Sequence, residues 1–347
     1  MRSLNNSCYN LPFSHIYVER DVLHHPRTKK ILEHFPKAKK IIIDHYKDIF
    51  CRSGQDYEKQ HCAQKLILAA KHGTLLYEGA PVCQSFGNQN FYYTSCVMNC
   101  VYDCEYCYLK GMYPSGNLVI FVNLEDIFEE VTQKLKEHSM YVCVSYDADL
   151  LAMEPIAGYV AEWSTFVEKQ NQIHPGQLKI EVRTKCADRR IFEKIPANSG
   201  VIWAFTLSPQ QIIDDFEHRT PSLKQRLSCA AEAMKKGFLV RLCFDPMLYC
   251  KDWQKQYEEM LHQVAEVMDM ERLVDVSVGT FRVSQEYLKK MRKGEPDSAV
   301  VQFPYQNDGG VCHYPTALME EMEGYLVKTL ENWLPVERIF RWQNEEE

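Results

Sequence analysis

The sequence lacks the segments that carry a protein into or across a membrane. No run reaches the roughly 18 apolar residues of a membrane-spanning helix, and the N-terminus has no charged start followed by an apolar stretch. The 347 residues also lack an excess of positive charge, since 40 lysines and arginines stand against 47 aspartates and glutamates, a formal net charge of -7. We therefore expect a cytoplasmic protein with no membrane partner, whose contacts with nucleic acid would need a local basic patch.

Disordered and repetitive segments are scarce as well. Hydrophobic residues make up 46% and charged residues 25%, which is an ordinary globular composition, and the one biased stretch is the acidic tail at 344–347. Cysteine, in contrast, is abundant, with 14 residues. In a cytoplasmic protein we expect these thiols to be reduced, with the clustered ones binding metal or taking part in catalysis.

Strand and helix patterns alternate over residues 90–284. Short apolar, β-rich runs predict seven strands, at 91–94, 118–123, 140–145, 178–184, 200–207, 238–244 and 273–281. Amphipathic patterns predict helices between them, for example at 124–138, 222–237 and 252–269. Continuous apolar strands separated by such helices are typical of parallel βα units with both sheet faces covered.

These patterns predict an α/β fold organised around a partial (β/α) barrel at 90–284. The segments before residue 90 and after about residue 285 lack the alternating rhythm. We expect them to be satellite elements, an N-terminal segment at 1–89 and a C-terminal extension at 285–347 that contains a hairpin and a helix.

Candidate site residues follow directly from this fold. The chemistry of a βα barrel lies at the C-terminal ends of its strands, so the residues that follow each strand are candidates. They are the cysteine cluster after the first strand, Cys143 and Ser145 at the third, Lys185 after the fourth, Thr206 and Ser208 at the fifth, and Asp245 after the sixth.

The cysteine cluster is the stretch CVMNCVYDCEYCYLKG at 96–111. Cys100, Cys104 and Cys107 have the spacing C-x3-C-x2-C, and Cys96 lies four residues before them. Zinc ribbons and fingers pair two C-x2-C knuckles across a longer loop, whereas only one such knuckle, CEYC, is present here. Three thiolates on one tight loop instead suit a 4Fe-4S cluster whose fourth iron is free for a chelating ligand.

This spacing, with an aromatic residue before the last cysteine, resembles the radical S-adenosylmethionine (radical SAM) superfamily. The triplet also follows the first strand of a βα series, as the resemblance requires. The resemblance implies a 4Fe-4S cluster held by Cys100, Cys104 and Cys107, with S-adenosyl-L-methionine chelating the open iron. One-electron reduction would then cleave S-adenosylmethionine and yield a 5'-deoxyadenosyl radical.

Further stretches, in matching order over most of the chain, resemble the spore photoproduct lyase family. They are 16-IYVER-20, 104-CEYCYLK-110, 118-LVIFVNLEDI-127, 143-CVS-145, 184-TKC-186, 205-FTL-207, 216-FEHRTPSLKQR-226 and 339-IFRW-342. The resemblance implies a DNA-repair lyase that reverses the methylene-bridged thymine dimer. Its partners would be DNA containing the thymine photoproduct and an electron donor such as flavodoxin or ferredoxin.

The resemblance also implies catalytic roles for two residues. Cys143, followed two residues later by Ser145, occupies the place of the family's hydrogen-donor cysteine, whose weak S–H bond would quench a thymine radical. Tyr108 would relay hydrogen between this cysteine and the deoxyadenosyl group, because a tyrosine O–H is a hydrogen donor that hydrogen bonds can hold in place. Without the resemblance, Cys143 is interpreted as a buried strand cysteine and the tyrosine as a core residue.

Contacts with S-adenosylmethionine are implied for four further positions. Tyr106 would stand beside the adenine, and Ser145, Lys185 and Thr206 match family positions that approach the cofactor. Lys185 would pair with the cofactor carboxylate as a compact charge, although a lysine at the end of a strand is more often a solvated cap. Asp245 suits either a ribose hydroxyl or an Asp-Pro turn.

Two features depart from the family pattern. Cys96 is an additional thiol, which serves either as the first cluster ligand or as a spare; we favour Cys100, because its spacing matches the superfamily. The family's C-terminal hairpin is basic and aromatic, whereas 298–318 keeps an NDGG turn and aromatic residues without a run of lysine and arginine. A substitute phosphate contact is offered by 282–294, which contains Arg282, Lys289, Lys290, Arg292 and Lys293, although such a run is usually a solvated helix face.

Two enzymatic functions therefore remain, because the hairpin leans slightly against duplex DNA. The first is a lyase acting on the thymine lesion, and the second is a radical SAM enzyme of the same lineage acting on a different substrate, which need not be DNA. A third hypothesis, a cluster-binding or zinc-stabilised interaction protein, is disfavoured by Cys143, since a structural protein has no need of a donor thiol.

Overall fold

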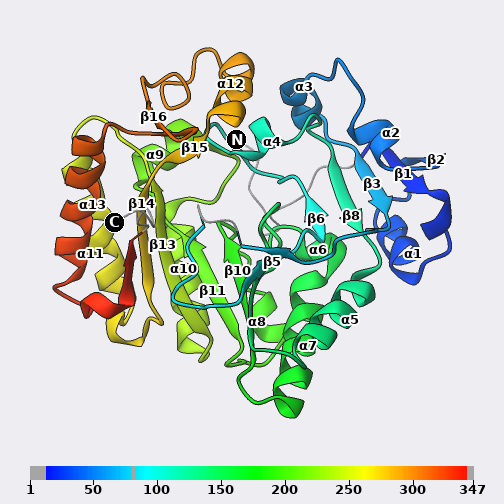
Figure 1. Cartoon of the computed structure of the whole chain (residues 1–347), viewed down its shortest axis with the longest axis horizontal. Helices are drawn as coiled ribbons and strands as arrows, with labels where there is room; N and C mark the ends of the chain where they lie inside the picture. Colours follow the sequence, from blue (N-terminus) through cyan, green and yellow to red (C-terminus); the bar gives the residue numbers. More distant parts are fainter. Residues whose placement is uncertain (1–12, 80–82, 342–347) are drawn as a thin grey trace.

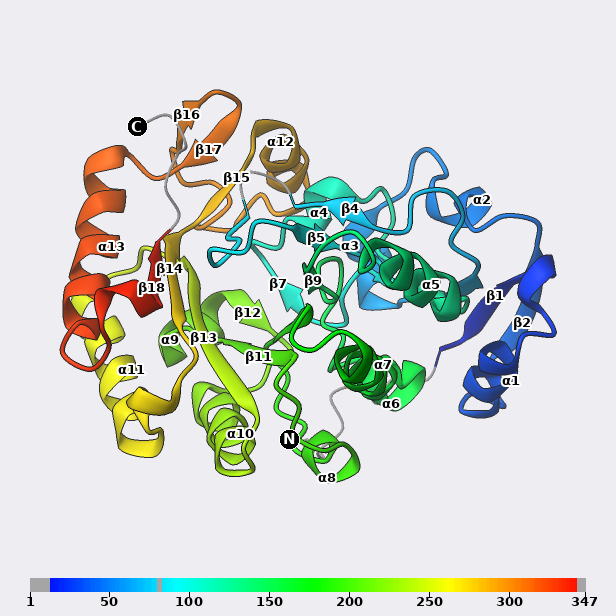
Figure 2. The same cartoon turned by 60° about the horizontal axis from the view of Figure 1, so that its bottom comes forward.

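A curled sheet of eight strands forms the centre of the protein (Figures 1 and 2). The computed structural model describes residues 13–79 and 83–341. The strand order is β18-β14-β13-β11-β10-β9-β5-β4, and all neighbouring pairs are parallel except β4 and β5. The strands are β4 (Tyr77–Glu78), β5 (Phe91–Tyr93), β9 (Met140–Cys143), β10 (Leu178–Thr184), β11 (Val201–Thr206), β13 (Leu239–Met247), β14 (Val276–Thr280) and β18 (Ile339–Arg341). The predicted partial (β/α) barrel is thus confirmed.

Helices alternate with the barrel strands and cover their outer face (Figure 2). Among them α7 packs on β10, α10 on β11 and β13, and α13 on β14 and β18. They are α5 (Leu124–Lys134), α6 (Glu154–Ala157), α7 (Tyr159–Ile173), α8 (Ile191–Lys194), α9 (Gln210–Phe216), α10 (Leu223–Lys235), α11 (Trp253–Val267) and α13 (Thr316–Leu330), with 3-10 turns at Met270–Arg272 and Val336–Arg338. The helices predicted at 124–138, 222–237 and 252–269 are therefore confirmed, the first shorter at its C-terminal end and the other two shorter at both ends.

The two ends of α10 explain why the sequence predicted this helix. Ser222 and Gln225 form a capping box, which satisfies free backbone N–H groups at the first turn. Gly237 follows the helix with φ of 86°, a left-handed conformation that costs glycine little.

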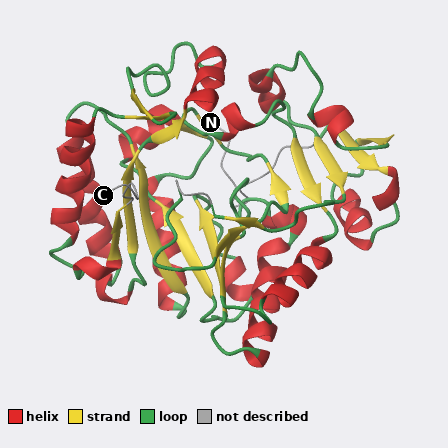
Figure 3. Ribbon diagram, viewed as in Figure 1, coloured by secondary structure: helices red, strands yellow, loops and turns green. Residues whose placement is uncertain are grey.

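A second sheet, absent from the prediction, lies beside the barrel (Figure 3). Its order is β2-β1-β3-β8-β6, with β1 (His15–Glu19), β2 (Lys39–Ile43), β3 (Leu66–Ala69), β6 (Val97–Met98) and β8 (Leu118–Phe121). The expectation that 118–123 is a barrel strand is wrong, because β8 pairs with β3 and β6. The segment before residue 90 does carry strands and helices in alternation, namely η1 (Arg20–Val22), α1 (Pro26–Glu33), α2 (Lys47–Phe50) and α3 (Tyr57–Cys62) between the strands.

The C-terminal part contains the expected hairpin and helix. β15 (Arg282–Ser284), β16 (Gln306–Asp308) and β17 (Val311–His313) form an antiparallel sheet, and α12 (Gln285–Gly294) follows β15. Gly309 and Gly310 have φ of 58° and 88°, so the NDGG turn uses two residues that tolerate left-handed backbone. Trp342 of the IFRW stretch and the acidic tail lie outside the described residues.

Two findings bear on the expected environment of the chain. Across residues 13–79 and 83–341, no helix combines the length and apolar character needed to cross a membrane. Cys186 is disulfide-bonded, which corrects the expectation of uniformly reduced cysteines, because sequence spacing alone does not reveal which thiols meet. The cysteines at 96–107 are free thiols.

The barrel wall depends on tightly packed aromatic side chains. All six residues of β11 are buried, and Trp203 within it packs edge-on against Phe192, with ring centroids 4.8 Å apart, and against Phe238 at 5.8 Å. Removing such a side chain leaves a cavity that the surrounding rings cannot fill.

We predict that Trp203→Ala lowers the free energy of unfolding by about 3–5 kcal/mol. Urea unfolding followed by circular dichroism measures this change. The matched control is Ile173→Ala at the end of α7, where the side chain is 68% exposed, and the expected change is within about 0.5 kcal/mol. Equal losses in the two variants would contradict the assignment of Trp203 to the core.

Candidate active site

A cavity of about 420 Å³ opens at the carboxyl ends of the barrel strands. Residues at the ends of β9, β10 and β11 line it, together with the cysteine loop and β15. The predicted site residues on its wall are Cys100, Cys104, Tyr106, Cys107, Tyr108, Cys143, Ser145, Lys185, Thr206 and Asp245. Strand-end position thus selected residues that meet in space, although their chemical roles remain predictions.

The loop that carries the cysteine triplet is held by its neighbours. A short strand, β7 (Asp103–Cys104), pairs antiparallel with β12 (Glu217–His218), so that Cys104 lies opposite Glu217. On the other side, the carbonyl oxygen of Cys100 accepts hydrogen bonds from His61 Nε2 and Gln64 Nε2, both at 3.0 Å. After the last cysteine the chain enters the short helix α4 (Leu109–Met112). Both the barrel and the N-terminal segment therefore fix this loop.

Cys96 lies apart from the triplet. Its side chain is 1% exposed, its Sγ lies 3.7 Å from the carbonyl oxygen of Val144, and it does not line the cavity. Burial raises the pKa of the Cys96 thiol to about 12. Of the two candidates for the first ligand, Cys100 is the one that faces the cavity.

The three thiols of the triplet are spaced too widely for a single zinc ion. Zn–S bonds of about 2.3 Å in a tetrahedral site bring sulfur atoms to about 3.8 Å from one another. Within the described part of the chain, the one group of three metal-binding side chains with all ligand atoms within 4.8 Å is Glu58, Asp103 and Glu295. Wider spacing of the cysteines around a shared cavity is what a cluster requires, because each thiolate then binds a different iron.

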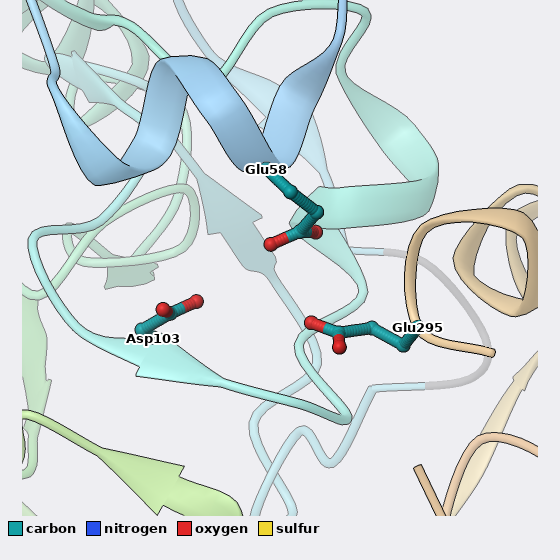
Figure 4. A group of neighbouring side chains, drawn as sticks. All are labelled: Glu58, Asp103 and Glu295. Atoms are coloured by element: carbon teal, nitrogen blue, oxygen red, sulfur yellow. The ribbon is translucent and has the colours of Figure 1, made fainter. Parts of the chain in front are cut away.

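The three carboxylates of that acidic group point toward one another (Figure 4). They surround a lysine rather than a metal site, since Lys110 Nζ bonds to Asp103 at 2.9 Å, to Glu58 at 3.2 Å and to Glu295. Burial acts to lower the pKa of Lys110, but the carboxylates outweigh it and raise this pKa above its ordinary value. The group is an ion-pair cluster that joins α3, the cysteine loop and the end of α12.

Lys185 lies against the cysteine loop. Its Nζ is 3.8 Å from Cys104 Sγ, 3.7 Å from Glu217 Oε1 and 5.0 Å from the centre of the Tyr106 ring. The side chain is 16% exposed, so the alternative of a solvated strand cap is wrong. A positive charge is thereby held beside one of the three thiols.

Glu217 organises this end of the cavity, although the sequence alone did not single it out. Its carboxylate accepts hydrogen bonds from Ser208 Oγ at 2.8 Å, from Tyr106 Oη and from Arg226. Burial acts to raise the pKa of Glu217, but Arg226 and Lys185 outweigh it and hold this pKa at about 2. Ser208, a strand-end candidate, is therefore bound to this carboxylate and does not line the cavity.

Cys143 lies at another part of the same wall, with its side chain 7% exposed. Its Sγ is 3.9 Å from Glu181 Oε1, and the neighbouring Ser145 Oγ accepts a hydrogen bond from the backbone N–H of Arg183 at 2.7 Å. Burial is the main cause that raises the pKa of the Cys143 thiol, and Glu181 adds to it. The thiol is therefore protonated near neutral pH.

Two further cavity residues were missed from the sequence. Tyr108 Oη donates a hydrogen bond to the carbonyl oxygen of Tyr146, and Tyr146 Oη lies 3.7 Å from Cys83 Sγ. Both Cys83 and Tyr146 line the cavity. No motif marks either one; only the fold brings 83 and 146 beside the cysteine loop.

The basic run at 282–294 is not a single charged surface. Arg282 lies 3.4 Å from Asp245 at the cavity, and Arg292 donates to the carbonyl oxygens of Val301 and Phe303. Of the predicted phosphate contacts, the lysines that lie exposed are Lys289, Lys290 and Lys293.

The partial βα barrel and the three cysteines at its strand ends define a radical SAM type of fold. The chain belongs to the spore photoproduct lyase family, whose model, described as "Spore photoproduct lyase", matches residues 12–296. The family resemblance inferred from the sequence is thus confirmed.

Two curated relatives are similar to parts of the chain. The spore photoproduct lyase of Clostridium acetobutylicum is 25% identical over 173 residues, 49% of this chain and 50% of the relative. That of Bacillus subtilis is 21% identical over 198 residues, 56% of each chain. The matched region therefore spans about half the length of these relatives.

Solved structures match over nearly the whole chain. A cysteine-to-alanine variant of spore photoproduct lyase with dinucleoside spore photoproduct has a TM-score of 0.80 at 16% identity, covering 96% of this chain and 98% of that one. A double variant with bound AdoMet and dinucleoside spore photoproduct has a TM-score of 0.77 at 18% identity, with the same coverage. At these identities the likeness establishes the fold.

The two buried carboxylates predict a pH dependence of stability. Glu181 and Glu217 both have a pKa of about 2, below the ordinary value of 4.5. A carboxylate with a lowered pKa stabilises the folded state fully above its unfolded pKa, and this contribution is lost as pH falls toward the folded pKa. The free energy of unfolding should therefore fall between about pH 5 and about pH 2, as measured by urea unfolding. Glu217→Gln should show a shallower fall, and an unchanged slope in this variant would contradict the assignment.

Proposed function

We propose that the protein is a radical SAM lyase that reverses the methylene-bridged thymine dimer in DNA. The observation that carries the proposal is that the cysteine triplet, Tyr108 and Cys143 line one cavity at the barrel strand ends. A cluster site and a hydrogen-donor thiol on the same wall suit a reaction that begins and ends with transfer of a hydrogen atom. Family membership supports the same chemistry.

The chain's residues fit a 4Fe-4S cluster with S-adenosylmethionine. Cys100, Cys104 and Cys107 would hold three irons, since all three thiols face the cavity at a spacing wider than zinc requires. When bound, the cluster and S-adenosylmethionine supply a 5'-deoxyadenosyl radical that takes a hydrogen atom from the lesion. The cavity of about 420 Å³ lies within the range of small-molecule sites.

Four side chains would orient the cofactor. Lys185 offers an ammonium group to its carboxylate, and Tyr106 offers an aromatic edge beside the adenine, held by its hydrogen bond to Glu217. Ser145 Oγ already accepts a hydrogen bond from Arg183, so its own hydrogen is free to donate. Thr206, at the end of β11, supplies a further hydroxyl on the cavity wall.

Cys143 would end the reaction by giving up a hydrogen atom. When the methylene bridge opens, one thymine is left as a carbon radical; the S–H bond of Cys143 breaks, a C–H bond forms, and the sulfur becomes a thiyl radical. Tyr108 would restore the thiol by giving up the hydrogen of its O–H, which the carbonyl oxygen of Tyr146 holds in place, and its tyrosyl radical would regain a hydrogen atom from 5'-deoxyadenosine. This sequence requires Cys143 to be a thiol rather than a thiolate.

The wider biological setting follows from the same proposal. The lesion would reach the cavity from DNA in the cytoplasm, past the hairpin formed by β16 and β17, and a flavodoxin or ferredoxin would supply the electron. One observation favours a second function, a radical SAM reaction on a substrate other than DNA. The exposed hairpin turn, with Gln306, Asn307 and Asp308, carries no cation for phosphates.

The cluster assignment predicts a clear difference between neighbouring cysteines. Cys104→Ala should abolish formation of the 4Fe-4S cluster on anaerobic reconstitution, because two thiolates leave two irons without a protein ligand. Cys96→Ala, the matched control, should retain the full iron content, since that thiol is turned away from the cavity. Iron and sulfide analysis with absorption spectroscopy measures both. A full cluster in the Cys104 variant would overturn the ligand set.

The reaction is tested with the dinucleoside spore photoproduct, which bypasses duplex binding. The reduced, reconstituted protein should convert it to two thymidines and cleave S-adenosylmethionine, as measured by liquid chromatography and mass spectrometry. Cys143→Ala should still cleave the cofactor but yield mainly side products of the unquenched radical. Cofactor cleavage without any repair by the unmodified protein would favour the second function, and normal repair by the Cys143 variant would contradict its role.

A further inference from the structure

The hydrogen-donor thiol has a charged neighbour with no role in the proposed reaction so far. Glu181, in the middle of β10, is 2% exposed and lies with Oε1 3.9 Å from Cys143 Sγ. Because this contact is long, rotation about the Cβ–Sγ bond is enough to turn the S–H from the carboxylate to the cavity. A carboxylate in such a place costs free energy unless it is fully paired.

Glu181 is paired by three groups. Arg183 Nε donates to Oε1 at 2.9 Å, and Oε2 accepts from Tyr141 Oη at 2.6 Å and from Arg241. Burial acts to raise the pKa of Glu181, but Arg183 and Arg241 outweigh it, so the carboxylate remains ionised. Cys143 and Arg183 therefore share one oxygen of a fixed anion.

Arg183 is the group that favours loss of the proton from the Cys143 thiol. It lines the cavity, lies beside Cys143 and acts to lower the pKa of that thiol, whereas burial and Glu181 raise it. The other ionisable groups here are Cys83, which also raises the pKa of Cys143, and Asp245 and Cys243, which act on Arg183. With Glu181 removed, the partly exposed guanidinium of Arg183 would lose its nearest anion and favour a thiolate in its place.

We propose that Glu181 is a positioning residue that keeps Cys143 a hydrogen donor. Its carboxylate forms the ion pair with Arg183, so that the sulfur of Cys143 can stay an uncharged thiol. A thiolate has no hydrogen atom to give to a carbon radical, so loss of this carboxylate would enlarge the fraction of Cys143 that cannot act as a donor. The inference rests on the proposed role of Cys143 and assigns Glu181 and Arg183 opposite effects on the same sulfur.

Alkylation of Cys143 by iodoacetamide tests this, because only the thiolate reacts. The reconstituted protein, Glu181→Gln and Arg183→Gln would be labelled across a pH series and the Cys143 peptide quantified by mass spectrometry. Glu181→Gln should react about tenfold faster or more at neutral pH, the change in thiolate fraction when a thiol pKa falls by about one. Arg183→Gln should react no faster than the unmodified protein, and the double variant should return toward it. Cys229, fully buried in α10, serves as an internal report of unfolding.

The opposite directions separate charge from loosened structure. If the two substitutions merely exposed the thiol, both single variants would be alkylated faster and the plateau of the alkylation rate at high pH would rise. The proposal instead predicts that only the pH midpoint of alkylation changes, and only in Glu181→Gln. Equal rates in Glu181→Gln and the unmodified protein would overturn it. If Cys229 is alkylated in Glu181→Gln, that variant is unfolded and Arg183→Gln decides the question. Faster alkylation of Cys143 in Arg183→Gln than in the unmodified protein overturns the proposal, and alkylation that is no faster supports it. None of these readings needs turnover, so failure of the lyase reaction would be seen separately.

Discussion

The cysteine loop depends on one buried carboxylate, that of Glu217. It binds Tyr106 from the loop itself, Ser208 after β11 and Arg226 from α10, while Lys185 after β10 lies 3.7 Å away. Four segments distant in sequence thus meet at one anion. Removing any single partner would leave a charge or a donor unpaired where water cannot reach it, at a cost of about 3–5 kcal/mol for a broken buried pair. Through this one group the loop is tied to α10 and to the ends of β10 and β11.

A similar arrangement recurs beside Cys143, with a different consequence. At Cys104, Lys185 brings an extra cation against a sulfur that would carry an iron, which favours an anionic cluster. At Cys143, the carboxylate of Glu181 neutralises the guanidinium of Arg183, which disfavours an anionic sulfur. Burial raises the pKa of both thiols, but the neighbouring charges act differently: Lys185 acts to lower the pKa of Cys104, whereas Glu181 acts to raise the pKa of Cys143.

Between residues 90 and 284, local pattern was sufficient for the main strands and helices and for the residues at their ends, because apolar periodicity indicates burial and strand-end position indicates the site. It missed the strands and helices before residue 90. It was insufficient for strand partners. The run LVIF at 118–121 fits any buried strand, and pairing with β3 rather than with the barrel is decided by side chains far away in the sequence. Glu181 was nevertheless detectable in principle: an acidic residue inside LKIEVRT, with the apolar residues around it buried, must have a cation within reach. Cys83 and Tyr146 offered no comparable signal.

The N-terminal segment has a physical reason to be present, although none of its described residues before Cys83 lines the cavity. His61 binds the carbonyl oxygen of Cys100, and Glu58 shares the ammonium group of Lys110 with Asp103 and with the end of α12. These contacts hold the loop from the side opposite Glu217. The cysteine loop has backbone pairing along only one two-residue strand, and its second anchor comes from α3 in the N-terminal segment. This segment therefore supports the loop, which the cysteine spacing alone could not have revealed.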